Sequence, residues 1–249
     1  MFPGLSLDRG ARLLVVVAHP DDETFGCGSL LLRAAAEGLV TGVCCATRGE
    51  AGEIAPGADV PGADLGRVRE DELRRAAALL GVTHVDLLGF EDSGMSGDPA
   101  PSALAAATPA TVRESVRSAA QPFDPDVLVT LDASDGHRDH VVMRDATLGV
   151  GDQLGLPVYL HCLPRSLMQQ WVDHMLRDRP ETEHLAVREQ LGELGTPDEL
   201  VDVVLDQTDH LGARETAISA HRSQTSPFEG LPPELRRAFL GHDHLQRAR

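Results

Sequence analysis

The sequence predicts an α/β fold, in which helices cover both faces of a mostly parallel sheet. Five short apolar runs recur along the chain, and they are rich in Val, Leu and Cys. Continuous runs of this kind are typical of strands that are buried on both faces, whereas half-exposed strands alternate apolar and polar residues. Amphipathic stretches of helical length separate the runs. This alternation of strand and helix favours a Rossmann-like, doubly wound sheet.

The elements follow from these patterns in chain order. The predicted strands are residues 13–18, 41–47, 84–90, 127–132 and 157–162. The predicted helices between them are residues 24–37, 65–80, 111–120 and 140–154. Gly38 and Gly81 directly follow two of these helices, at the position where glycine commonly ends a helix.

The remaining segments are harder to assign. Residues 56–64 are rich in Gly and Pro and predict a loop, and residues 93–109 predict a flexible connection. Residues 169–197 are charged and leave open whether they form a helical excursion or a mobile segment. A late strand is expected at 201–206 and helices at 208–223 and 232–240, whereas His242 and His244 are expected in a solvated tail. Without an internal repeat or a break in composition, residues 1–249 predict a single domain.

Composition excludes several functions. The chain has 249 residues and a formal net charge of −17, a field that repels nucleic acid. It contains no Lys, so that Schiff-base, P-loop and lysine-base chemistry is excluded. The four cysteines form no CxxC pair and predict buried, reduced thiols. No apolar run is long enough for a membrane span, so we expect a soluble, cytoplasmic protein. The sequence is also compatible with a homo-oligomer.

Two polar clusters follow predicted strands directly. Residues 19–23 read His-Pro-Asp-Asp-Glu after the first strand, and residues 132–140 read Asp-Ala-Ser-Asp-Gly-His-Arg-Asp-His after the fourth. Each cluster has a simpler interpretation as a polar loop with an acidic helix cap. That interpretation explains one carboxylate in the first cluster, but not a histidine together with three consecutive carboxylates.

The predicted topology brings the two clusters together. In the strand order 3-2-1-4-5, strands one and four are neighbours at the point where the order reverses, and ligands of such sheets bind beyond the carboxyl ends there. Two histidines and at least one aspartate in that crevice provide the ligand set of a catalytic zinc ion with open positions for water. Iron(II) and manganese(II) suit the same ligands.

These residues resemble the LmbE-like (PIG-L) family of zinc-dependent N-acetylglucosaminyl deacetylases and related amidases. Residues 19–23 match the leading motif of that family, and Gly-His-Arg-Asp-His at 136–140 matches the second. Further matches are Thr-Arg-Gly-Glu-Ala-Gly-Glu at 47–53, Asp-Ser-Gly-Met at 92–95 and His-Arg-Ser-Gln at 221–224. The resemblance covers roughly residues 12 to 150, and beyond them only the last of these motifs.

The resemblance implies specific roles. His19, Asp22 and His140 would bind zinc, and Asp21 would be the general base that takes a proton from the attacking water. His137 would stabilise the oxyanion or protonate the leaving amine, and Asp139 would orient His137. Substrate contacts are implied for the side chains of Arg69, Asp92 and Gln224. For Arg69 and Asp92, a surface arginine and a turn-capping aspartate are equally good interpretations.

One position departs from the family pattern. Some sugar deacetylases of the family have a Tyr just before Gly-His of the second motif, where it contributes to the oxyanion site. Asp135 stands there in this chain. Because an ionised carboxylate would repel an oxyanion, either Asp135 points away from the reacting atoms or the transition state is stabilised differently.

The function implied is therefore metal-dependent hydrolysis of an amide C–N bond, with an N-acetylglucosamine-type amino sugar or its conjugate as substrate. An amidase that cleaves a sugar–amino-acid amide, as in mycothiol conjugates, is an alternative of the same class. A dinucleotide enzyme is disfavoured, because Leu31 replaces the third small residue of a glycine-rich turn that begins at Gly26. A non-catalytic binding protein is disfavoured because the ligands, the base and the acid are all retained.

Overall fold

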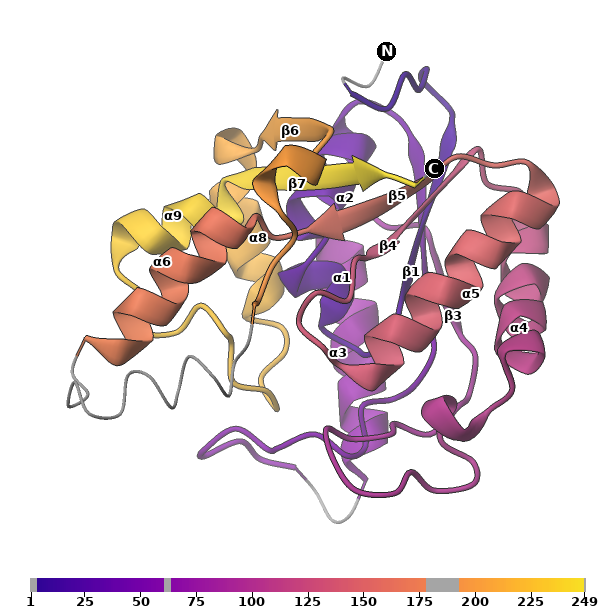
Figure 1. Cartoon of the computed structure of the whole chain (residues 1–249), viewed down its shortest axis with the longest axis horizontal. Helices are drawn as coiled ribbons and strands as arrows, with labels where there is room; N and C mark the ends of the chain where they lie inside the picture. The colour runs from indigo at the N-terminus through magenta and orange to yellow at the C-terminus, as the bar shows by residue number, and fades with distance from the viewer. Residues whose placement is uncertain (1–3, 61–63, 178–192, 249) are drawn as a thin grey trace.

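The computed structural model describes residues 4–60, 64–177 and 193–248 of the chain. Its centre is a seven-stranded sheet in the order β3-β2-β1-β4-β5-β7-β6 (Figure 1). Strands β1 to β5 pair in parallel, whereas β7 pairs antiparallel with both β5 and β6, so that among the strands described β7 alone runs against the others. The predicted α/β class and the order 3-2-1-4-5 of the first five strands are confirmed.

The first five strands match the apolar runs to within a few residues. They are β1 (Arg12–Val17), β2 (Val40–Cys45), β3 (His84–Leu87), β4 (Val127–Leu131) and β5 (Val158–Cys162). In β1, Leu13, Val15 and Val17 point to one face of the sheet, and Leu14 and Val16 point to the other. Each set enters a different hydrophobic core, so that β1 is buried from both sides.

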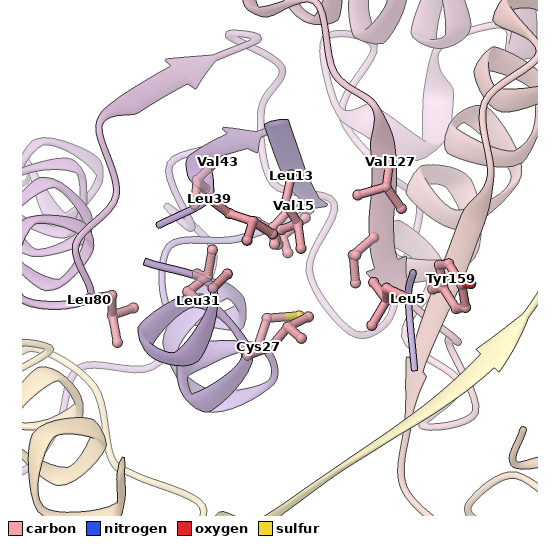
Figure 2. Close-up of a cluster of buried hydrophobic side chains, with 14 of the residues drawn as sticks. Leu5, Leu13, Val15, Cys27, Leu31, Leu39, Val43, Leu80, Val127 and Tyr159 are labelled. Atoms are coloured by element: carbon pink, nitrogen blue, oxygen red, sulfur yellow. The ribbon is translucent and has the colours of Figure 1, made fainter. Parts of the chain in front are cut away.

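Helices cover each of these faces. The first core, shown in Figure 2, packs the sheet against α2 (Gly28–Ala36), α3 (Leu65–Leu79) and α8 (Leu211–Ile218). The second core packs the opposite face against α4 (Pro109–Phe123) and α5 (Arg138–Leu154). In Figure 1, α4 and α5 accordingly lie on one side of the sheet and α2 on the other. All four cysteines are buried and free, as expected.

The predicted helix 24–37 is in fact two helices, and this prediction was wrong in its continuity. A short turn, α1 (Asp22–Phe25), ends before α2 begins. The carbonyl of Asp22 accepts from the N–H groups of both Gly26 and Cys27. A Cβ atom on Gly26 would lie 2.7 Å from the Leu131 side chain and 2.8 Å from the Asp22 carbonyl oxygen. Only glycine therefore fits at this break without a shift of β4 or α1.

The C-terminal part of the chain completes the sheet. The expected late strand is β6 (Val203–Asp206), and α6 (Arg165–Leu176) and α9 (Pro233–Leu240) lie side by side beyond β5 (Figure 1). The expected helix 208–223 is shorter, with a 3-10 turn (Thr208–His210) before α8. Most of the uncertain segment 169–197 lies outside the described residues. None of the helices described is both long and apolar enough to cross a membrane.

The prediction of a solvated tail at His242 and His244 was wrong. These residues belong to β7 (His242–Arg247), which pairs with β5 on one side and β6 on the other. Between them, Asp243 is fully buried, and its carboxylate lies 3.0 Å from Nε2 of His161 and accepts a 2.6 Å hydrogen bond from Gln207. The residues of β7 look polar, but they form a strand in which the buried carboxylate of Asp243 is paired with His161 and Gln207, which are distant in the sequence.

Candidate active site

The two polar clusters meet at the carboxyl ends of β1 and β4. His19 to Asp22 follow β1 directly, and His137 to His140 begin α5. The His19 ring centroid lies 4.6 Å from that of His137 and 5.3 Å from that of His140, and the latter two are 4.8 Å apart. One nitrogen of each of the three rings lies within 4.8 Å of the others, close enough to share a metal ion. The crevice expected from the strand order therefore exists.

Asp22 connects two of these histidines. One carboxylate oxygen, Oδ2, accepts a 2.9 Å hydrogen bond from the His19 backbone and lies 3.6 Å from His19 Nδ1. The other oxygen lies 3.3 Å from His140 Nε2. Burial alone would raise the pKa of Asp22, but His140 and His19 outweigh it and hold that pKa well below the usual value. Asp22 is thus an ionised carboxylate placed between two imidazole nitrogens.

Each ring nitrogen of His140 faces a carboxylate. Its Nδ1 lies 2.6 Å from the Asp135 carboxylate, while Nε2 is buried and has no hydrogen-bond partner among the described residues. Nε2 faces Asp22 at 3.3 Å; burial alone would lower the pKa of His140, but the Asp22 and Asp135 carboxylates outweigh it and raise that pKa to about 10. Carboxylates that pair in this way with the outer nitrogen of a histidine are typical of metal centres. Asp135 is therefore turned towards His140.

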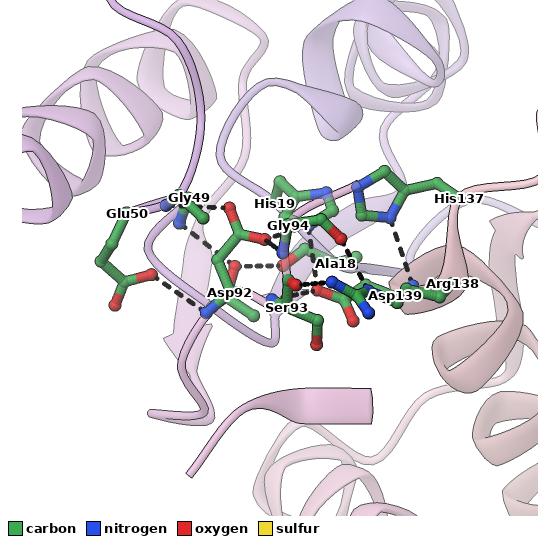
Figure 3. Close-up of polar contacts among 12 residues, drawn as sticks. Ala18, His19, Gly49, Glu50, Asp92, Ser93, Gly94, His137, Arg138 and Asp139 are labelled. Atoms are coloured by element: carbon green, nitrogen blue, oxygen red, sulfur yellow. Dashed lines mark hydrogen bonds and ion pairs between the residues drawn. The ribbon is translucent and has the colours of Figure 1, made fainter. Parts of the chain in front are cut away.

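A second group of ligand atoms surrounds the other nitrogen of His19 (Figure 3). Nε2 of His19 lies 3.3 Å from Asp139 and 3.5 Å from Asp92. The Asp139 carboxylate also accepts a 3.0 Å hydrogen bond from the Ser93 backbone, whereas its own N–H donates to His137 Nδ1 at 3.2 Å. The side chain of Asp139 thus contacts His19, and only its backbone contacts His137.

Asp21 stands beside this cluster in an unusual backbone conformation. Its φ of 141° lies in a region that L-residues rarely adopt, and its N–H donates a 3.0 Å hydrogen bond to Glu23. Burial, together with the charge of Asp22, raises the pKa of Asp21 to about 7. A carboxyl group of this kind is well matched to proton transfer at neutral pH.

Comparison with known proteins identifies the family. Residues 14–150, more than half of the chain, match the PIG-L family, described as GlcNAc-PI de-N-acetylase. The chain belongs to this family. It is 32% identical over 268 residues to the 1D-myo-inositol 2-acetamido-2-deoxy-alpha-D-glucopyranoside deacetylase of Thermomonospora curvata, an alignment that covers 95% of this chain and 90% of that protein. The resemblance inferred from the motifs is confirmed, and the chain is an enzyme of the amidohydrolase type.

Solved structures confirm the fold of this PIG-L enzyme. A deacetylase of the teicoplanin biosynthesis pathway superposes with a TM-score of 0.65 at 21% identity, covering 96% of this chain and 99% of the other. GalB, a 4-carboxy-2-hydroxymuconate hydratase from Pseudomonas putida KT2440, superposes with a TM-score of 0.62 at 17% identity, and each chain is covered to 96%. Because a hydratase shares the fold, the fold by itself does not determine the reaction.

Sequence reasoning gave no role to two residues that hold the PIG-L site in place. Glu23 was noticed as part of the acidic run, and His221 was interpreted as ordinary packing. The structure pairs them, with 3.0 Å between Glu23 Oε1 and His221 Nε2, and both are fully buried at their side chains. Gln224 then donates a 2.7 Å hydrogen bond to the carbonyl of Pro20. The motif at 221–224 was the available signal, because it accompanied the first motif in the family resemblance.

Arg69 is neither exposed nor directed at solvent. It is 6% exposed, and its guanidinium donates to the carbonyls of Gly49 at 2.7 Å and Glu53 at 2.9 Å. A Cβ on Gly52 would lie 2.1 Å from the guanidinium, so that this loop needs glycine to pack against it. The surface interpretation of Arg69 was wrong. Arg69 joins Asp92 and Gln224 in lining a polar cavity of about 340 Å³ beside the histidines.

Proposed function

We propose that this chain removes the N-acyl group from an N-acetylglucosamine-type amino sugar, by hydrolysis with metal-activated water. The observation that supports this most is the convergence of His19 and His140 on the buried carboxylate of Asp22, next to the carboxyl group of Asp21. Relatives named as deacetylases of an acetamido sugar linked to inositol suggest the same bond and a substrate of this class.

The residues present fit a divalent metal ion. Nε2 of His140 and Nδ1 of His19 both face the ionised carboxylate of Asp22, and loss of the proton from each of these nitrogens would leave a lone pair for the metal. We propose His19, Asp22 and His140 as the ligands of zinc, although iron(II) or manganese(II) would accept the same donors. A zinc ion held there would polarise the substrate carbonyl and lower the pKa of water.

The remaining residues have roles that follow from their positions. Asp21 accepts a proton from the water that attacks the amide carbon. The C–N bond breaks, the acyl group leaves as a carboxylic acid, and the sugar nitrogen takes up a proton. His137, half-buried and next to both other histidines, is placed to donate to the carbonyl oxygen or to that nitrogen. Asp139 fixes the ring of His19 through its carboxylate and that of His137 through its N–H.

Substrate binding is assigned to the polar cavity. Asp92 is ionised there: burial would raise its pKa, but the hydrogen bond with His19 and that residue's charge lower it to about 2. Together with Arg69 and Gln224 it offers both donors and acceptors to sugar hydroxyl groups. The amidase alternative, cleavage of a sugar–amino-acid amide, would use the same machinery on a different acyl group.

The first experiment combines metal content with amine release. The purified protein is analysed for bound metal, and then incubated with N-acetylglucosaminyl inositol, N-acetylglucosamine and a sugar–amino-acid amide before and after chelation. We expect about one metal ion per chain, with release from the first substrate that chelation stops and zinc restores. If release persists unchanged after complete removal of the metal, the proposed mechanism is wrong.

The variant Asp21→Asn tests the base. Asn has nearly the same shape but cannot accept a proton, so kcat should fall about 10²- to 10⁴-fold while the metal content stays the same. The matched control is Asp152→Asn on the exposed side of α5, which should change neither quantity. Full activity of Asp21→Asn would show that another group takes the proton.

A further inference from the structure

A second cavity of about 290 Å³ opens from the same reacting centre. Asp21, Asp22 and His140 line both this cavity and the polar one, so the two lie on either side of the proposed metal site. The walls differ in chemistry. The polar cavity is lined by arginine, glutamate and glutamine, whereas the second is lined largely by aromatic and aliphatic side chains from α1, α6, α9 and residues 227–231.

The aromatic residues of this chain are concentrated at the second cavity. The whole sequence contains six Phe, one Trp and one Tyr. Four of these eight aromatic residues line the cavity, namely Phe25, Trp171, Phe228 and Phe239. Phe228 contacts both Phe25 and Phe239 edge-on or tilted, with ring centroids 6.0 Å apart in each case. Phe228 and Phe239 belong to a cluster of buried hydrophobic residues, and the half-buried Phe25 and Trp171 pack against it, so that the cavity has an apolar wall.

The polar groups on this wall are already paired within the protein. Asp132 accepts hydrogen bonds from the backbone and hydroxyl of Ser134 at 3.1 and 3.0 Å. His161 lies 3.0 Å from Asp243, and Arg214 donates to backbone carbonyls. A ligand rich in hydroxyl groups would therefore lose its hydrogen bonds to water on entry and gain few in return. An apolar ligand pays no such penalty.

We propose that this cavity binds the acyl part of the substrate, and that this acyl group is an apolar chain longer than acetyl. The inference rests on the proposed function and makes its substrate class more specific. The sugar occupies the polar cavity, the amide lies at Asp21, Asp22 and His140, and the chain extends towards Trp171. Hydrolysis breaks the amide C–N bond. The water oxygen goes to the acyl carbon, so that a medium-chain carboxylic acid and a free amino sugar are released.

The test is a pair of substrate series with the metal-loaded enzyme. In the first, glucosamine carries acetyl, butanoyl, hexanoyl or octanoyl on nitrogen; in the second, N-acetylglucosamine carries alkyl glycosides of matching length. We expect kcat/KM to rise about three- to fourfold for each methylene added to the acyl group until the cavity is filled. The glycoside series should show little change.

Substitutions and tryptophan fluorescence test whether the dependence of kcat/KM on acyl-chain length arises in this cavity. Trp171→Ala should lower the hexanoyl-to-acetyl ratio of kcat/KM on the order of tenfold, whereas Met175→Ala, an exposed position on the same helix, should keep it. Trp171 is the single tryptophan. Its emission should therefore shift saturably when N-hexanoylglucosamine is added to the slow Asp21→Asn variant, and much less with N-acetylglucosamine.

The possible results distinguish a failure of this inference from a failure of the proposed function. If acetyl is hydrolysed and longer acyl chains are not, the function stands and the inference is overturned. If rates rise with the alkyl glycoside instead, the cavity binds the aglycone and the inference is again overturned. If no amide in either series is hydrolysed by metal-loaded protein, the proposed function itself fails.

Discussion

At the scale of single residues, the site depends on the strained backbone of Asp21. A φ of 141° and ψ of −32° cost a non-glycine residue on the order of 1–3 kcal/mol. Hydrogen bonds on both sides of the strained unit hold it: Glu23 accepts from the Asp21 N–H, and Gln224 donates to the Pro20 carbonyl. The sequence predicted the ionisable groups at 19–22. It could not show this strain, because one of the two residues that maintain it, Gln224, lies 204 positions from Pro20 in the chain.

Asp135 should control metal affinity without touching the metal. Its carboxylate fixes the His140 tautomer, so Asp135→Ala should weaken zinc binding about 10- to 100-fold. Competition with a chelator of known affinity measures this, and Asp152→Ala on the exposed face of the same helix is the control. Unchanged zinc affinity in Asp135→Ala would mean that His140 is oriented by its packing alone.

The pair of His221 and Glu23 should make stability depend on pH. Burial alone would lower the pKa of His221, but Glu23 outweighs it and raises that pKa above 6.5. The folded state then binds the proton more tightly than the unfolded chain does. This contribution is fully present below pH 6.5 and is lost as pH rises through the folded pKa.

Urea unfolding of wild type and His221→Gln at pH 5.5 and pH 9 checks this prediction. The free energy of unfolding of the wild type should exceed that of the variant by more at pH 5.5 than at pH 9. If the difference in unfolding free energy between wild type and His221→Gln is larger at pH 9 than at pH 5.5, His221 is buried in its neutral form.

At the scale of elements, α1 is a single turn that begins with Asp22, one of the proposed metal ligands. Its last carbonyls have no continuing helix to satisfy them. Arg214 from α8, which is 1% exposed, donates to the carbonyls of Thr24 at 3.3 Å and Gly26 at 3.0 Å, and also to that of Leu240. A buried arginine thus ties α1 to the C-terminal helices, although no carboxylate forms a direct ion pair with it among the described residues.

Arg214→Met should therefore destabilise the fold strongly. Several buried carbonyls would lose their donor, and the free energy of unfolding should fall by about 3 kcal/mol. Chemical denaturation measures the change, and Arg237→Met on the exposed side of α9 should have an effect within experimental error. Near-equal stability of the two variants would imply that water replaces the guanidinium.

Elements differed in how well they could be predicted. The five apolar strands were found because burial on both faces leaves a continuous apolar run. The break at Gly26 was missed because α1 and α2 together have the pattern of one helix. The close approach of Leu131 on β4, which leaves no room for a Cβ atom at Gly26, comes from a segment far away in the sequence. The strand β7 was missed because His242, Asp243 and His244 look like solvated residues, and the pairing of Asp243 with His161 spans 82 positions.

At the scale of the whole molecule, the site joins two parts of the sheet that are far apart in sequence. His19 and Asp22 follow β1, and His140 lies in α5 after β4. The topology that unites them was predictable, because strand order and the carboxyl-end rule suffice to place both clusters in one crevice. The apolar cavity was not, because its aromatic side chains come from four separate segments that show no common pattern.

A bound metal should stabilise the entire fold. Because the proposed ligands are brought together only in the folded state, zinc at 1,000 times its Kd would add about 4 kcal/mol to the free energy of unfolding. Thermal unfolding should shift to lower temperature with a chelator and recover with zinc. Asp22→Ala should show neither shift, and a zinc response that persists in this variant would place the metal elsewhere.

The position of β7 in the sheet has a consequence for the order in which the protein can fold during synthesis. β6 has no partner strand until residues 242–247 have been made, since β7 separates it from β5. A nascent chain that ends before β7 would therefore expose the open edge of β5 and an orphan β6 on the ribosome. Docking of the parallel core can precede the synthesis of β7, but closure of this edge must wait for the segment that follows α9.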